Sequence, residues 1–142
     1  MKKTILSLLC LLLPLCMMLC LAACGNSVKT EGLWENAVYQ EDASFGDGQK
    51  EVTVEVKAGE KSVTLTIYTD AEFLGEALLS HNLIDGEMGQ FGMYIKSANG
   101  IIADYDEDQS YWGFFKNGEY MMTGVDATKI TDGEHYELVY TK

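Results

Sequence analysis

The chain has 142 residues and a formal net charge of −12, because 22 acidic side chains outweigh 10 lysines and no arginine is present. Nucleic-acid recognition depends on arginine forks and basic stripes. The composition therefore excludes nucleic acid as a partner, and the length suits one domain with its own core beside any targeting segment.

The N-terminus has the pattern of a lipoprotein signal. Two lysines precede an apolar run from Ile5 to Leu21, and two alanines separate that run from Cys24. In such a signal, small residues fit the peptidase and the cysteine thiol takes the lipid. We predict a signal peptide over residues 1–23, lipidation of Cys24, and a tether over 24–36 that holds the protein on the extracytoplasmic face of the cell membrane. A transmembrane helix is the alternative, since about 20 apolar residues can span a bilayer.

Alternating apolar and polar residues predict the first part of the domain. Residues 51–57 and 63–68 alternate strictly and predict a half-buried hairpin, while 37–45 gives a weaker first edge strand. A capping box over Thr69 to Glu72 and an apolar stripe behind it predict a helix that ends at Asn82. Gly75 in this helix costs about 1 kcal/mol relative to Ala, so we expect it to approach the sheet closely.

The remaining elements follow from turn residues and further alternation. We expect a glycine-punctuated loop over 83–92, a strand over 93–96, an Asn99-Gly100 turn and a return strand over 101–103. The acidic residues 104–110 predict a loop, and 136–141 predicts a last strand. Residues 37–142 therefore predict one α+β domain, a mostly antiparallel β-sheet with one packed helix.

The stretch from Tyr111 to Met122 gives the strongest structural signal. Asn117-Gly118 stands between two apolar runs, and a type I′ turn needs positive φ at both central residues. In a two-residue hairpin, paired residues share a face. We therefore expect these pairs: Lys116 with Glu119, Phe115 with Tyr120, Phe114 with Met121, Gly113 with Met122 and Trp112 with Thr123.

Both faces of this predicted hairpin are apolar. Trp112, Phe114 and Met121 share one face, on which Trp112 is the expected core anchor. Gly113 leaves a notch on the other face, and a glycine inside a strand often marks the close approach of a ligand. We predict that this other face binds a ligand through Tyr111, Phe115, Tyr120 and Met122. The alternative is that another part of the chain covers it.

Other candidate sites are weaker. Asp104, Asp106 and Asp108 match the start of a calcium loop, but Gln109 and Phe115 stand where glycine and glutamate are needed. A solvated loop is expected there. His81 and His135 are the only histidines; His81 is expected as a dipole partner at a helix C-terminus, with a metal ligand as the alternative. No spacing sets a nucleophile beside a base. We therefore predict no catalytic residue, no metal site, no cofactor and no enzymatic activity.

Four segments, in this order, resemble a known family. They are residues 73–78, Gly92 to Ile95 leading to Asn99-Gly100, Tyr111-Trp112 through Asn117-Gly118, and Gly124-Val125 followed by Asp132-Gly133. From about Val52 to the end, the chain resembles the transcobalamin C-terminal-like domain, which is also known as a domain of unknown function in bacterial surface lipoproteins. The resemblance implies a small β-rich domain with one helix. In the vertebrate cobalamin carriers such a domain closes over the corrin ring.

Two functions are consistent with these features. The first is a membrane-anchored binding module for cobalamin or another corrinoid-like ligand, which it would hand to an envelope transporter. The alternative is a protein–protein interaction or adhesion module of the cell envelope that docks another surface protein.

Overall fold

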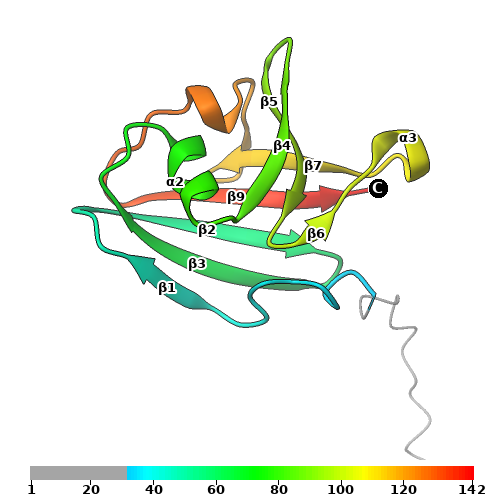
Figure 1. Ribbon diagram of the computed structural model, residues 1–142, viewed down its shortest axis with the longest axis horizontal. Coiled ribbons are helices and arrows are strands. Elements are labelled where there is room, and N and C mark those ends of the chain that lie inside the picture. Colours follow the sequence, from blue (N-terminus) through cyan, green and yellow to red (C-terminus); the bar gives the residue numbers. More distant parts are fainter. Residues whose placement is uncertain (1–31) are drawn as a thin grey trace, which may run out of the picture.

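The computed structural model describes residues 32–142, which form two β-sheets and three short helical segments (Figure 1). The strands are β1 (Ala43–Gly46), β2 (Lys50–Ala58), β3 (Lys61–Thr69), β4 (Ile84–Gly89), β5 (Gly92–Ala98), β6 (Ile101–Ile102), β7 (Tyr111–Lys116), β8 (Glu119–Tyr120) and β9 (Glu134–Thr141). The helical segments are α2 (Leu74–Ser80), α3 (Tyr105–Asp108) and the 3-10 turn η1 (Val125–Ala127). The predicted signal peptide, Cys24 and most of the predicted tether lie outside the described residues. Within residues 32–142, no helix has the length and apolar character needed to cross a membrane.

The larger sheet has six strands in the order β1-β3-β2-β9-β7-β8, and the smaller one has the order β4-β5-β6. Five of the seven strand pairs in the described part are antiparallel; β1 with β3 and β2 with β9 are parallel. The C-terminal strand thus enters the middle of the sheet, between the β2–β3 hairpin and β7. The predicted α+β class with a mostly antiparallel sheet is confirmed.

The core lies on one face of the large sheet, under α2 and the small sheet (Figure 1). Strand alternation puts every second residue of β2, β3, β7 and β9 on this inner face. Its fully buried members include Val52, Val54, Val56, Val63, Leu65, Ile67, Tyr136 and Leu138. Helix α2 adds Leu74, Ala77 and Leu78, and β5 adds Ile95. Before β1, Trp34 is also buried, and its indole Nε1 donates to the Ala58 carbonyl at 2.9 Å.

Several predicted elements differ from the structure near the small sheet. Residues 83–92, predicted as a loop, contain the whole of β4, whose glycines hid the strand pattern. Gly86 lies at an irregularity in the β4–β5 register, where an added Cβ would stand 2.2 Å from the Tyr94 carbonyl oxygen. The predicted acidic loop contains α3, because the Asp104 side chain accepts hydrogen bonds from the Asp106 and Glu107 amides at its N-terminus.

The predicted helix exists and stops where expected, but its first residue and the element it packs against differ from the prediction. Asn82 has a left-handed backbone (φ 54°), as expected for the residue that stops the helix. Helix α2 begins at Leu74, later than the predicted capping box. A Cβ added to Gly75 would lie 3.0 Å from the Asp126 Cα, so this glycine permits close packing against η1 and not against the sheet.

The Asn117-Gly118 turn is confirmed, with φ of 50° and 81° at the two residues. The pairs Lys116–Glu119 and Phe115–Tyr120 form, and the Met121 amide donates to the Phe114 carbonyl at 2.9 Å. The predicted pairs of Gly113 with Met122 and of Trp112 with Thr123 are wrong. After Tyr120 the chain leaves the sheet, and β7 pairs along its whole length with β9 on its other side.

Candidate ligand-binding groove

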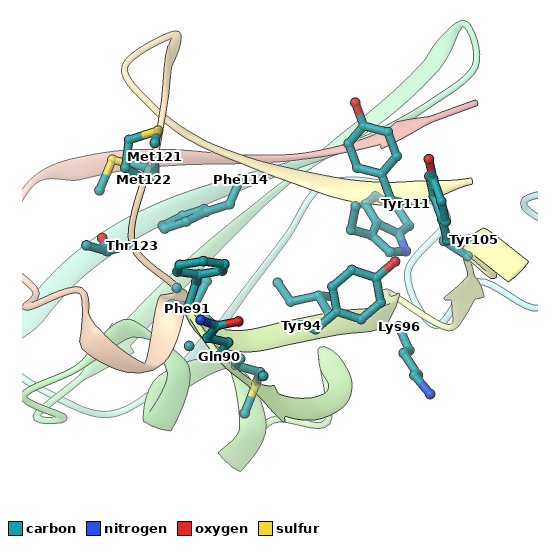
Figure 2. A pocket seen from close by; sticks show the side chains of 18 of the residues that line it. Gln90, Phe91, Tyr94, Lys96, Tyr105, Tyr111, Phe114, Met121, Met122 and Thr123 are labelled. Carbon is teal, nitrogen blue, oxygen red and sulfur yellow. The ribbon is translucent and has the colours of Figure 1, made fainter. Parts of the chain in front are cut away.

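A groove of about 880 Å³ lies between the small sheet and the β7–β8 edge of the large sheet (Figure 2). Its lining comes from four parts of the chain: the β4–β5 turn with β5, the β6–α3 segment, β7, and residues 120–125. Aromatic, methionine and aliphatic side chains predominate, namely Phe91, Met93, Tyr94, Ile95, Ile102, Tyr105, Tyr111, Trp112, Phe114, Tyr120, Met121, Met122 and Val125. The charged members of the lining are Lys96, Asp104 and Asp106.

Trp112 and Phe114 come from the inner face of β7 and are held firmly by the core. Each is only 7% exposed. The Trp112 indole Nε1 donates to the Ile101 carbonyl at 3.1 Å, which ties β7 to β6, and its ring meets Tyr140 edge-on at 5.7 Å. Phe114 stacks on Tyr136 with ring centroids 5.9 Å apart. These two rings therefore give the groove a rigid aromatic base.

The β4–β5 hairpin forms the opposite wall. It projects from the body of the domain, and its turn carries Phe91, which is 83% exposed (Figure 1). Figure 2 shows the rings of Phe91 and Phe114 at the same end of the groove, near Met121 and Met122. Flexible thioether side chains beside aromatic rings are typical of adaptable binding surfaces.

A tight backbone crossing closes this end of the groove. The Asp126 carboxylate accepts a hydrogen bond from the Met93 amide at 2.7 Å, which joins η1 to β5. A Cβ added to Gly124 would lie 2.3 Å from that carboxylate oxygen and 2.9 Å from the Met93 nitrogen. Only glycine at position 124 leaves room for this contact.

Helix α3 borders the other end, which combines aromatic rings with negative charge. Tyr94 and Tyr105 lie there in Figure 2, and Asp104 and Asp106 belong to the lining. Burial, followed by the neighbouring Asp106 and Asp104 carboxylates, raises the pKa of the Tyr94 phenol. The Lys96 ammonium pairs with the Glu87 carboxylate at 2.8 Å.

Comparison with known proteins places this domain in a family. A family model described as a domain of unknown function, DUF4430, matches residues 71–142. The chain belongs to the DUF4430 family. Among solved structures, one from Ruminococcus gnavus ATCC 29149, which carries the provisional description metal binding protein, is 37% identical with a TM-score of 0.62. The similarity covers 66% of this chain and 98% of that one.

Haptocorrin in complex with Cbi is a more distant structural match. It is 23% identical with a TM-score of 0.49, over 69% of this chain and 26% of the haptocorrin chain, so this chain spans about a quarter of that protein. No curated protein shows a significant match to the sequence.

The structure places three of the four predicted ligand-binding residues of the DUF4430 domain at the groove. Tyr111, Tyr120 and Met122 belong to its lining, whereas Phe115 does not. The Phe115 ring meets Tyr120 edge-on at 5.3 Å on the outer face of the sheet. There it also occupies the predicted notch, since a Cβ on Gly113 would lie 3.0 Å from the Phe115 ring. The notch expected to admit a ligand is thus covered by the chain's own aromatic ring.

Several lining residues were not predicted. Trp112, Phe114 and Met121 were assigned to the core face, and they do lie there, but that same face continues into the groove. Phe91, Tyr94 and Tyr105 were missed altogether. The available signal was an aromatic residue in each of the apparently loop-like segments 83–92 and 104–110, where large apolar side chains are otherwise out of place.

Exposed apolar residues concentrate at this groove. Residues 32–142 contain ten exposed large hydrophobic side chains. Six of these belong to the lining, namely Phe91, Tyr94, Ile102, Tyr105, Tyr120 and Met122. Contiguous exposed apolar surface of this kind usually marks an interaction site.

The other candidate groups have local partners. The His81 ring contacts Phe45 at 4.8 Å between centroids, and the His135 Nδ1 lies 2.8 Å from the Thr53 hydroxyl. Asp108 accepts hydrogen bonds from Ser110 and contacts the Lys142 ammonium at 2.6 Å. No group of three or more His, Cys, Asp or Glu residues suited to a metal ion occurs in the described part of the chain.

Proposed function

We propose that this chain is a membrane-anchored extracytoplasmic lipoprotein whose DUF4430 domain is a non-enzymatic binding module. Its ligand is flat and largely apolar, with cobalamin or another corrinoid as the leading candidate. The observation that carries this proposal is the groove between β5 and β7, where six exposed hydrophobic side chains surround a rigid aromatic base. Its volume of about 880 Å³ lies within the usual range for small-molecule sites.

The chemistry of the lining favours binding over catalysis. Tyrosine, tryptophan, phenylalanine and methionine offer broad apolar contact area, and a flat ring system can stack on such side chains. The described lining contains no histidine, cysteine or serine, the residue types from which nucleophile–base pairs are usually built.

A ligand that brings its own metal would also agree with the description of the Ruminococcus gnavus protein. That protein is provisionally described as metal binding. Residues 32–142 of this chain provide no cluster of three ligating side chains. A corrinoid already holds its cobalt in the macrocycle, so the protein would need only to bind the ring and its edges.

Calorimetric titration with cobalamin and cobinamide tests the proposed function. The full-length chain would be purified in a non-ionic detergent, beside the variants Phe91→Ala and Met88→Ala. Both residues lie near the tip of the β4–β5 hairpin and are exposed, but only Phe91 lines the groove. We expect binding that weakens about tenfold in Phe91→Ala, as for the loss of one aromatic contact, and that is unchanged in Met88→Ala. An absence of heat with either compound, at protein concentrations that detect micromolar binding, contradicts the corrinoid proposal.

A protein-docking module of the cell envelope is the second candidate. Met88 is 68% exposed and lies beyond the groove lining, so the apolar surface of the hairpin continues past the space that a small molecule would fill. A gene for a vitamin importer beside this one would favour the first function. Neighbouring genes for adhesion or cell-wall proteins would favour the second.

The lipid anchor is tested separately. If Cys24 carries the lipid, a Cys24→Ala variant should move from the detergent phase to the aqueous phase on partitioning, because the acyl chains that hold the protein are lost. A variant that partitions like the wild type would contradict the proposed anchor.

A further inference from the structure

We propose that the α3 end of the groove selects a flat organic cation, whose positive charge lies among the Tyr94 and Tyr105 rings and the Asp104 and Asp106 carboxylates. This inference rests on the proposed function, since it names the charge class of the ligand for the same groove. It distinguishes an N-methylated heteroaromatic cation from neutral and anionic molecules of the same shape.

The aromatic part of this end suits a cation. Tyr94 from β5 and Tyr105 from α3 both belong to the lining, and Figure 2 shows them at the same end of the groove. Tyr94 is 42% exposed and Tyr105 is 57% exposed, so ring surface is available on both. The negative face of an aromatic ring attracts a cation within about 6 Å of the centroid, and desolvation strengthens this attraction.

The charged part of this end is negative. Asp104 and Asp106 belong to the lining, and no lysine pairs with either of them among residues 32–142. Lys96, the one basic residue of the described lining, is held at 2.8 Å by Glu87. In Figure 2 the Lys96 side chain points away from Tyr105. A ligand cation would therefore meet two carboxylates that form no ion pair with a lysine among residues 32–142.

The groove as a whole matches a ligand of this class. Its other end is apolar, with Phe91, Phe114, Met121 and Met122 and no charged side chain in the described lining. A flat molecule could stack its apolar part there and extend its charged part toward α3. An anion would instead be opposed by the two aspartates and by the net charge of −12 on the chain.

Three probes of nearly the same shape separate charge from shape. N-methylacridinium is a permanent cation, acridine is neutral at mildly alkaline pH, and acridine carboxylate is an anion. Their binding to the full-length chain in a non-ionic detergent can be followed by the fluorescence anisotropy of the probe. We expect the cation to bind about tenfold more tightly than the neutral probe, the scale of a partly desolvated cation–π contact assisted by carboxylates, and the anion to bind most weakly.

Two double variants distinguish the groove from the general acidity of the chain. Asp104→Asn with Asp106→Asn removes the two groove charges, and asparagine at position 104 can still cap α3. Glu41→Gln with Glu60→Gln changes the net charge equally at exposed positions outside the lining. We expect the first pair to lose most of the preference for the cation and the second pair to retain it. Far-UV circular dichroism checks that both variants are folded.

The outcomes separate this inference from the proposed function. Equal affinity for all three probes would overturn the cation preference and leave the groove as a binding site. Equal loss of preference in both double variants would also overturn it, since the attraction would then come from the whole surface. Binding of none of the three probes would overturn the inference, whereas the proposed function is decided separately by the titration with cobalamin and cobinamide.

Discussion

Replacing Trp112 with alanine should remove a side-chain hydrogen bond and a buried ring that join the two sheets. The Trp112 side chain is 7% exposed, meets Tyr140 edge-on, and donates from Nε1 to the Ile101 carbonyl at 3.1 Å. Removing the ring also removes the indole donor of the Ile101 carbonyl. Because Ile101 is itself buried, this loss is costly. The variant therefore combines a large cavity with a lost hydrogen bond.

The cavity and the lost hydrogen bond together set the expected loss in the free energy of unfolding. Truncation of a buried tryptophan to alanine costs about 3–5 kcal/mol. Trp112→Phe keeps most of the ring volume but leaves the Ile101 carbonyl without the indole, so about 1–3 kcal/mol is expected. Because a domain of this size has a total stability of about 5–15 kcal/mol, Trp112→Ala should leave a marginal fold or none.

Urea unfolding gives a clean assay, because the chain contains one other tryptophan. Trp34 is 4% exposed, and its indole donates to the Ala58 carbonyl, so its fluorescence should report unfolding of the core in every Trp112 variant. Phe115→Ala and Tyr120→Ala serve as controls from the opposite face of the same hairpin. Tyr120 is 59% exposed and should shift the free energy of unfolding by less than about 0.5 kcal/mol. Phe115 covers Gly113 on the outer face and should cost about 1 kcal/mol.

The ranking of these variants tests the assignment of the two faces. If Phe115→Ala unfolds the protein while Trp112→Ala is tolerated, the faces have been assigned backwards. If all three positions prove essential for folding, the hairpin is core on both sides and the groove must be reconsidered as a binding site.

Three further changes test other parts of the structure. Asn99→Ala should lower the free energy of unfolding in urea by about 1–3 kcal/mol, because the buried Asn99 side chain accepts from the Tyr39 amide and donates to the Tyr39 carbonyl, each at 2.8 Å. A loss below about 0.5 kcal/mol would contradict this role. Gly124→Ala should cost about 1–3 kcal/mol by displacing the carboxylate that accepts from the Met93 amide, whereas Gly32→Ala, which has open space around it, should be neutral. The Lys142 ammonium, with help from Ser110, holds the pKa of Asp108 at about 2, below its usual 3.8. The ionised Asp108 carboxylate therefore contributes to stability above about pH 4, and this contribution is lost as the pH falls toward 2. Asp108→Asn should flatten the stability profile in that window, and a carboxyl NMR titration that places the Asp108 pKa near 4 would refute the contact.

Local sequence patterns were sufficient for the elements whose side chains repeat regularly. Strict alternation predicted β2, β3 and β9, because a half-buried strand needs an apolar residue at every second position. The Asn117-Gly118 turn and the stop at Asn82 were also predicted, since both depend on a residue that tolerates positive φ. The DUF4430 family and the α+β class followed from the order of such short segments.

The groove could be predicted only in part, because it is made by contacts distant in the sequence. The faces of β7 followed from its alternation, but the chain leaves the sheet after Tyr120 and continues along the groove. The wall that carries Phe91 comes from β4 and β5, and the glycines of β4 hide its strand pattern. Which apolar face stays open therefore depends on where the small sheet packs.

Tertiary packing alone decided the remaining features. The position of β9 between β2 and β7 makes the large sheet mixed, and no local pattern specifies a parallel neighbour. Tyr94, Asp104 and Asp106 lie at one end of the groove, and the hydrogen bond from Trp112 to Ile101 holds the adjoining strand β6 against β7. Burial and charge are properties of the assembled surface, and a linear sequence shows only the residues from which that surface is built.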